Sequence, residues 1–323
     1  MTVEQSEFDR LLADISIVDP QLAEATRQID VGWGTNEPRD RELTELVATV
    51  LRGGIETGLF SLGTMVQGFN TFAHDFHARQ ADFLRSREYR AKDYAEVSRD
   101  VYSNEEFMRT VYYPALLLSY LASPNYRHIL RELDRTLTSW RERSASRVLE
   151  VASGHAFLLL FALRELPRAV GVGTDIAAAA GGFADALQRS TGWAEGRFRF
   201  AVGDVLAANA EAPFASFDAA ICCELLEHVP EPARFLRAIH ERLIPGGRLF
   251  LSAAVRMESV DHLTLFESTA EITSLLAQQG FEVIREMSAP FLTRRPRDAA
   301  RWQKELRSPL VAATFVGECR KLT

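Results

Sequence analysis

SRVLEVASGHAF, residues 146–157, passes from one apolar run to another through a turn of small residues. Val148–Val151 predicts a short buried strand that carries Glu150 near its end. Ala152-Ser153-Gly154 predicts a tight turn, and the apolar residues from Phe157 onward predict a helix directly after it. Small residues let backbone N–H groups approach a ligand, and a helix N-terminus favours negative charge. The stretch therefore predicts a ligand-binding strand–turn–helix unit, whose carboxylate suits a cationic or hydroxyl-rich ligand better than a pyrophosphate.

The composition is that of a globular protein, with 323 residues of which 47% are hydrophobic and 25% charged. The net charge of −7 argues against a nucleic-acid-binding surface. No apolar run reaches the length of a membrane-spanning helix, and the first residues do not resemble a signal peptide. Two of the three cysteines are adjacent, at positions 222 and 223, and make poor disulfide partners. We therefore expect a cytoplasmic protein that does not associate with membranes.

Helical patterns dominate residues 1–122, which we expect to form a helical N-terminal cap domain. Gly53-Gly54 is expected to end one of its helices, and Pro114 is expected to interrupt another. We expect this cap to be the surface through which a homodimer would form. Whether the cap also forms part of a substrate pocket depends on its tyrosines.

All seven tyrosines lie between Tyr89 and Tyr126. Tyrosine combines an apolar ring with a phenol that forms hydrogen bonds when it is buried. The cluster therefore predicts a lid or pocket wall over an aromatic or mixed-polarity small molecule, with Tyr112 and Tyr113 as candidate substrate contacts. The alternative is that these tyrosines pack in a core of helices, with their phenol hydroxyls at the edge of that core.

From residue 123 to residue 323, strand patterns alternate with helix patterns, which predicts a mostly parallel sheet covered by helices on both faces. Ligands of such sheets bind beyond the carboxyl ends of the strands. Acidic residues follow the first three predicted strands, at Glu150, Asp175 and Asp204, and Cys222-Cys223-Glu224 ends the fourth. Asp175 is placed to accept hydrogen bonds from ribose hydroxyls, and Asp204 could accept one from an adenine amino group.

These motifs, in this order, resemble the class I S-adenosylmethionine-dependent methyltransferase family. Its first motif is an acid followed by alternating glycines, and Glu150–Ala156 follows that spacing with alanine at positions 152 and 156. The Gly-x-Gly-x-x-Gly fingerprint of a nicotinamide dinucleotide site is not present at this turn. The other matching stretches are Val172–Asp175, Val202–Val205, Phe217–Pro230 and Arg242–Ser252.

The resemblance implies a Rossmann-like α/β fold with seven strands in the order 3-2-1-4-5-7-6, in which strand seven is antiparallel. It also implies S-adenosyl-L-methionine as the cofactor. The residues that it assigns to cofactor binding are Glu150, Ala152, Ser153, Gly154, His155, Asp175, Ile176, Gly203, Asp204, Val205, Cys222 and Cys223.

Glu224-x-x-Glu227-His228 follows the fourth strand, and His262 follows the fifth. On one helical turn the first three side chains would share a face. The set resembles two methyltransferase branches that use a divalent metal, the ubiquinone-pathway O-methyltransferases and the small-RNA 3′-end methyltransferases. Magnesium, zinc and iron are the candidate ions. The alternative is a metal-free site in which His228 is the general base, because histidine titrates near neutral pH.

The resemblance thus implies methyl transfer from S-adenosylmethionine to the O, N or C atom of a small molecule, with a natural-product intermediate as the expected acceptor. Glu224, Glu227 and His228 are the candidate catalytic residues. One alternative is an RNA 3′-end-type enzyme, for which Arg294–Arg297 is the candidate basic segment. The other is a relative that binds S-adenosylmethionine without transferring its methyl group.

Overall fold

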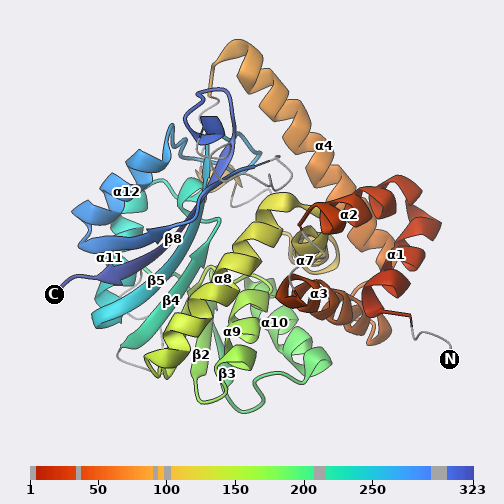
Figure 1. Cartoon of the computed structure of the whole chain (residues 1–323), viewed down its shortest axis with the longest axis horizontal. Helices are drawn as coiled ribbons and strands as arrows, with labels where there is room; N and C mark the ends of the chain where they lie inside the picture. Colours follow the sequence, from red (N-terminus) through yellow and green to blue (C-terminus); the bar gives the residue numbers. More distant parts are fainter. Residues whose placement is uncertain (1–4, 34–37, 90–93, 98–102, 207–215, 292–303) are drawn as a thin grey trace.

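The computed structural model describes residues 5–33, 38–89, 94–97, 103–206, 216–291 and 304–323. A group of N-terminal helices lies beside a curled sheet with helices on both faces (Figure 1). Within the described part of the chain, no helix has the length and apolar character needed to span a membrane. The N-terminal helices are α1 (Glu7–Val18), α2 (Pro20–Trp33), α3 (Pro38–Glu56), α4 (Leu62–Ser86), α5 (Tyr94–Val97), α6 (Glu105–Phe107) and α7 (Tyr113–Ala122).

Gly53-Gly54 does not end a helix, so that prediction is wrong: α3 continues through both glycines to Glu56. A Cβ atom at position 54 would lie 2.4 Å from Cζ of Phe60, and one at position 53 would lie 3.2 Å from Oγ of Ser190. The two glycines therefore allow close packing of α3 against its neighbours. The next helix, α4, begins after Ser61, whose hydroxyl accepts a hydrogen bond from the N–H of Thr64.

Pro114 does not break the apolar helix either, but it changes the helix type in front of it. A π-helical turn spans Met108–Tyr112, and α7 begins at Tyr113. Proline has no N–H, and its ring clashes with the carbonyl four residues earlier in an α-helix. The N–H of Tyr113 donates to the carbonyl of Met108, and this longer bond takes up one extra residue. The helix register therefore shifts directly before the tyrosine.

The sheet follows the predicted order. Its strands run β3-β2-β1-β4-β5-β8-β6, with the short β7 paired to β8. Neighbours from β3 to β5 are parallel, and β8 is antiparallel to β5 and β6. Because β8 is the predicted seventh strand, the order 3-2-1-4-5-7-6 is confirmed. The strands are β1 (Arg147–Val151), β2 (Val170–Asp175), β3 (Phe198–Val202), β4 (Phe217–Cys223), β5 (Leu243–Val255), β6 (Phe281–Glu286), β7 (Ala289–Pro290) and β8 (Ala313–Lys321).

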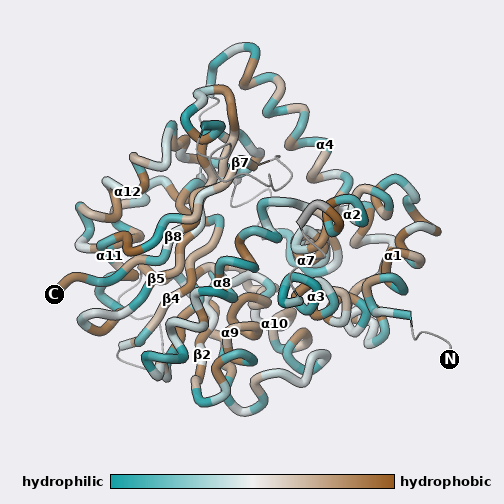
Figure 2. Tube along the Cα trace, viewed as in Figure 1, coloured by the Kyte–Doolittle hydropathy of each residue, from teal (hydrophilic) through white to brown (hydrophobic). Residues whose placement is uncertain are grey.

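Alternating strand residues pack into two different apolar clusters, one on each face of the sheet. Val148 belongs to the cluster that includes the N-terminal helices, whereas its neighbour Leu149 belongs to the other. In Figure 2 the hydrophobic colour follows the central strands β4 and β5. On the first face lie α8 (Pro124–Glu142), α9 (Phe157–Glu165) and α10 (Ala178–Thr191), and on the second lie α11 (Pro232–Arg242) and α12 (Thr269–Gln278).

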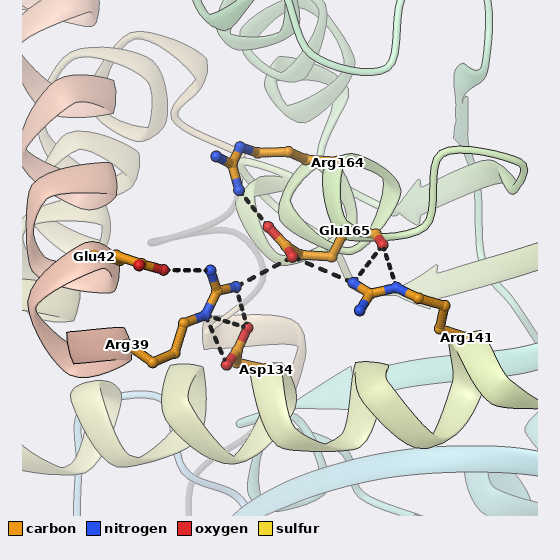
Figure 3. Close-up of polar contacts among 6 residues, drawn as sticks. All are labelled: Arg39, Glu42, Asp134, Arg141, Arg164 and Glu165. Carbon is orange, nitrogen blue, oxygen red and sulfur yellow. Dashed lines mark hydrogen bonds and ion pairs between the residues drawn. The ribbon is translucent and has the colours of Figure 1, made fainter. Parts of the chain in front are cut away.

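A polar network ties α3 to α8 and α9 (Figure 3). The Arg39 guanidinium contacts the Asp134 carboxylate and lies 3.1 Å from Oε2 of Glu165. Arg141 donates to the carbonyl of Glu165 at 2.7 Å, and Arg164 pairs with the same residue's carboxylate. The N-terminal helices thus share both an apolar cluster and an ion network with the sheet. The division of the chain into domains 1–122 and 123–323 stays a prediction.

Candidate functional site

A cavity of about 320 Å³ lies at the carboxyl ends of β1 to β4, where the fold places ligands. Tyrosines between positions 94 and 126 also line it. Eleven of the twelve predicted cofactor residues line it, and the exception is Cys222. Cys222 is fully buried in the apolar cluster on the α11–α12 face, because adjacent strand residues point to opposite sides. Its placement in the cofactor site was therefore wrong, whereas Cys223 does reach the cavity.

The turn after β1 alternates in backbone conformation. Ala152, Gly154 and Ala156 have φ values of 52°, 48° and 56°, in the left-handed region that favours glycine. Ala152 and Ala156 therefore have a backbone conformation that is strained for alanine. They lie two residues before and two residues after Gly154. The N–H of Ser153 donates to the carbonyl of Thr174 at 2.9 Å, which fixes the turn to the end of β2. Left-handed residues at every second position make the turn tight, and residues 152–155 of this turn line the cavity.

Replacing Ala152 with glycine should raise the free energy of unfolding by about 1 kcal/mol, because the substitution relieves left-handed strain. Ala156→Gly is the matched comparison, since Ala156 is completely buried and losing its methyl group costs roughly 0.8 kcal/mol. In Ala156→Gly the lost methyl packing should therefore largely cancel the gain in stability from strain relief. Urea unfolding of both variants checks this, and an Ala152→Gly protein less stable than the wild type would contradict it.

The strand-end acids are held by backbone N–H groups. Oδ2 of Asp175 accepts from the N–H of Gly154 at 2.9 Å, and Oδ1 accepts from Ala177 at 2.8 Å. Burial raises the pKa of Asp175 despite these bonds. Oε2 of Glu150 accepts from the N–H of Leu159 near the start of α9, and burial raises the pKa of Glu150 well above its usual range. These two carboxyls are thus fixed in position at the cavity wall.

The cavity fits the polar part of a nucleoside cofactor. The Ser153 hydroxyl is buried with no hydrogen-bond partner in the described structure, and Ser153 lines the cavity beside the turn. Asp204 is exposed at the end of β3, with Oδ1 accepting from the N–H of Leu206 at 2.8 Å. Carboxylates that can accept from hydroxyl and amino groups, together with an unsatisfied hydroxyl, suit ribose and adenine. S-adenosylmethionine carries both groups.

His155 is an aromatic packing residue as well as part of the turn. Its Nδ1 accepts from the N–H of Phe157 at 3.1 Å, and its ring lies edge-on to those of Tyr113 and Tyr120. Burial lowers the pKa of His155 to about 3. The imidazole is therefore neutral at pH 7, and it offers a cofactor no positive charge.

Tyrosines line much of the cavity, and the candidate substrate contacts Tyr112 and Tyr113 are among them. Tyr120 and Tyr126 were predicted only as members of the tyrosine cluster, and their rings meet edge to face with centroids 5.4 Å apart. The cluster between Tyr89 and Tyr126 was the signal that pointed to them. Tyr102 lies outside the described residues. The tyrosines that line the cavity are Tyr94, Tyr112, Tyr113, Tyr120 and Tyr126.

Glu224 does not share a helical turn with Glu227 and His228, so that expectation is wrong. Its φ of 47° is left-handed, and a 3₁₀ turn begins only at Leu226. Oε1 of Glu224 accepts from the Ser252 hydroxyl at 2.8 Å, and Glu224 lines the cavity. Burial raises the pKa of Glu224 to about 7, although the Ser252 hydrogen bond works in the opposite direction. The carboxyl is thus suited to take up a proton near neutral pH.

Glu227, His228 and His262 come together in a cluster that could hold a metal ion. One potential ligand atom from each lies within 4.8 Å of the other two. Both carboxylate oxygens of Glu227 are buried, and no side chain of the described structure donates a hydrogen bond to them. Glu224, the fourth predicted ligand, is not part of this cluster. His228 also lines the cavity, and the cluster therefore adjoins it.

The two imidazoles of this cluster are oriented by main-chain carbonyls. Nδ1 of His228 lies 3.1 Å from the carbonyl of Asp261, and Nδ1 of His262 lies 3.1 Å from that of Met257. A carbonyl only accepts, so each Nδ1 donates, and in the neutral ring the Nε2 atom then carries the lone pair. Metal-binding histidines commonly use this arrangement. The donor set therefore fits a divalent cation.

Sequence reasoning did not identify the residues that support this cluster. Oδ2 of Asp261 lies 3.4 Å from Nδ1 of His228. Gln80 of α4 donates to the carbonyl of Arg256 at 3.0 Å and accepts from the N–H of Glu258 at 3.1 Å, which anchors the loop before His262. Asp261 could have been suspected as the neighbour of a candidate ligand. Gln80 gave no signal, because its contact spans more than half the chain.

The chain has a fold similar to that of a solved methyltransferase structure. The solved structure of the mitomycin 7-O-methyltransferase MmcR is 16% identical, with a TM-score of 0.51, and the match covers 80% of this chain and 71% of that one. At this identity the likeness concerns the fold alone. The sheet order, with its acidic strand ends around one cavity, defines the Rossmann-like fold of the class I methyltransferases.

Part of the chain is similar in sequence to known methyltransferases. Residues 149–249 match the family described as a methyltransferase domain. The ubiquinone biosynthesis O-methyltransferase of Xanthomonas oryzae pv. oryzae (strain PXO99A) is 56% identical over 75 residues, which make up 23% of this chain and 30% of that relative. The protein of the same name from Pseudomonas paraeruginosa (strain DSM 24068 / PA7) is 52% identical over 40 residues, 12% of this chain and 17% of that relative. The family match, these relatives and the sheet order together support a class I S-adenosylmethionine-dependent methyltransferase.

Proposed function

We propose that this protein transfers the methyl group of S-adenosylmethionine to a hydroxyl oxygen of a small molecule with an aromatic or apolar body. The observation that carries the proposal is a cavity lined both by strand-end carboxyls and by tyrosines. The acids Glu150, Asp175 and Asp204 would hold the cofactor, and the tyrosines would hold the acceptor. The names of the Xanthomonas and Pseudomonas relatives support oxygen as the methylated atom.

Glu224 is the proposed general base. Its carboxyl lines the cavity beside Cys223, and the pKa of about 7 suits proton transfer at neutral pH. The acceptor hydroxyl would lose its proton to Glu224 while its oxygen gains the methyl group, and S-adenosylhomocysteine would remain. The protein's main contribution is to align the acceptor and to exclude water from the cavity.

We also propose that Glu227, His228 and His262 bind a divalent cation. A bound cation would hold acceptor hydroxyls and lower the pKa of the attacking oxygen. Two imidazoles and one carboxylate suit Zn²⁺ or Fe²⁺ better than Mg²⁺, which prefers oxygen ligands. In this arrangement His228 is a ligand, which excludes it from the role of general base.

The acidic cavity supports a small-molecule acceptor over RNA. Its lining includes Glu150, Asp175 and Asp204 but only one arginine among the described residues, Arg234. The basic segment Arg294–Arg297 lies outside the described residues. A natural-product intermediate is the proposed acceptor class, and the tyrosine wall is the feature that supports it.

Two measurements test the proposed function. Isothermal titration with S-adenosylhomocysteine should give saturable binding to the wild-type protein with a stoichiometry of about one, because one nucleoside site is proposed. Methyl-labelled S-adenosylmethionine should then label 3,4-dihydroxybenzoate, a catechol probe with an aromatic ring and two hydroxyls. Absence of S-adenosylhomocysteine binding would overturn the cofactor assignment. Binding without labelling of this probe or of a panel of related phenols would favour a relative that does not transfer methyl groups.

A further inference from the structure

Tyr113 is the first residue of α7, and its phenol lies against the cofactor turn. A Cβ atom at Gly154 would be 3.3 Å from Cε1 of this ring. The side chain is 1% exposed, and its hydroxyl is buried without a hydrogen-bond partner in the described structure. Burial, with a smaller contribution from the nearby Asp175 carboxylate, raises the pKa of Tyr113, so the phenol keeps its proton. It is therefore a hydrogen-bond donor with nothing to donate to.

A buried polar group without a partner costs free energy, so it needs a physical explanation. Tyr113 lines the same cavity as Gly154 and Asp175. The π-helical turn in front of Pro114 also ends at this residue, because the N–H of Tyr113 donates to the carbonyl of Met108. Such turns are frequent at functional sites. A ligand oxygen beside the phenol would explain the unpartnered hydroxyl.

We propose that Tyr113 is a cofactor-binding residue supplied by the N-terminal helices, and that its phenol donates a hydrogen bond to an oxygen of the bound nucleoside. This rests on the proposed S-adenosylmethionine site. The ribose is the assigned acceptor because the phenol is close to Asp175, the carboxylate at the end of β2. The sequence had suggested a substrate contact for Tyr113, and the packing against Gly154 moves it to the cofactor side.

Tyr113→Phe removes only the hydroxyl, and it should weaken binding of S-adenosylhomocysteine about tenfold in calorimetry, as expected for one buried hydrogen bond. The thermal midpoint of the ligand-free variant should equal or exceed that of the wild type, because an unsatisfied hydroxyl has been removed. A merely structural role would instead lower the midpoint and leave the affinity unchanged. Wild-type affinity in Tyr113→Phe would overturn the proposal.

Thr26→Val is the matched control. Thr26 of α2 also has a fully buried hydroxyl without a partner in the described structure, but it does not line the cavity. This variant should retain the wild-type affinity for S-adenosylhomocysteine, and equal losses in both variants would overturn the proposal by pointing to a general effect on the fold. Failure of the wild-type protein to bind the ligand would instead refute the proposed function, so the two failures are distinguishable.

5′-Methylthioadenosine, which has the nucleoside but not the amino-acid group, locates the acceptor. A ribose contact predicts that Tyr113→Phe weakens binding of this compound and of S-adenosylhomocysteine by similar factors. A loss confined to S-adenosylhomocysteine would overturn the ribose assignment and place the hydrogen bond on the amino-acid carboxylate.

Discussion

Zinc affinity should fall about a hundredfold or more in Glu227→Gln, while the protein remains folded. The Glu227 carboxyl is 1% exposed, and no side chain of the described structure donates a hydrogen bond to it. Glutamine has nearly the same size but no charge, so it is a much poorer ligand beside His228 and His262. Burial already raises the pKa of Glu227 well above its usual range, so a neutral amide in its place should have only a small effect on the free energy of unfolding.

The experiment begins with protein that has been treated with a chelator and dialysed, followed by calorimetric titration with Zn²⁺ and, separately, with Mg²⁺. Zn²⁺ should bind more tightly, because imidazole ligands favour it. Glu258→Gln is the matched control, since Glu258 is a buried acid of the same loop that is not part of the cluster. Unchanged zinc affinity in Glu227→Gln would remove the metal site. A loss of equal size in Glu258→Gln would show that the loop, and not the ligand, had been disturbed.

The alternation of strands and helices was enough to predict a mostly parallel sheet, whereas the strand order was implied by the resemblance to the class I methyltransferases. Apolar runs of strand length are separated by helix signals, and parallel connections of this kind have one handedness, so few strand orders remain. The end of the fourth strand was predicted at Cys222-Cys223-Glu224, and β4 ends at Cys223. The acidic residues at the strand ends were found for the same reason, because the end of a buried run is visible in the sequence.

Long-range packing and local backbone conformation could not be predicted in the same way. The glycines of α3 appeared to be helix breakers because the partners that require them, Phe60 and Ser190, are visible only in three dimensions. Glu224 was assigned to a helical face because its spacing from His228 fits one, but its left-handed backbone turns the side chain toward Ser252. Spacing predicts a shared face only where the backbone is known to be helical.

Glu224→Gln should lower kcat/KM about 10²–10³-fold with the phenolic probe, the range expected for loss of a general base. In the wild type, kcat/KM should rise with pH through about 7 and then level off, because only the ionised carboxyl accepts a proton. Glu224→Gln should lose this ascending limb. A limb that persists in Glu224→Gln but disappears in His228→Ala would return the role of base to His228. If Glu224→Gln lowered the zinc affinity as much as Glu227→Gln does, Glu224 would be a fourth ligand.

Stability gives a second test of Glu224 that needs no substrate. Its folded-state pKa lies above that of the unfolded chain, so folding favours the protonated carboxyl. The stabilisation is fully present below the unfolded pKa, near 4.3, and is lost as pH rises to about 7. The free energy of unfolding should therefore decline across this window, by roughly 1.4 kcal/mol per pH unit at most for this one group. Glu224→Gln should make the decline shallower in urea titrations at several pH values.

Ser252→Ala changes the same carboxyl without removing it. The Ser252 hydroxyl donates to Oε1 of Glu224 at 2.8 Å and lowers the pKa of that carboxyl, so its loss should raise the pKa of Glu224 further. The ascending limb of kcat/KM and the window of declining stability should then both move to higher pH. In Glu224→Gln, which has no ionisable group to shift, adding Ser252→Ala should leave both profiles where they are. If Ser252→Ala still shifts the kcat/KM profile in the double variant, the titrating group is another residue. If the shift occurs in the wild-type background but not in the double variant, the ascending limb of kcat/KM belongs to Glu224, because a carboxyl with only a structural role would not control the pH dependence of the reaction.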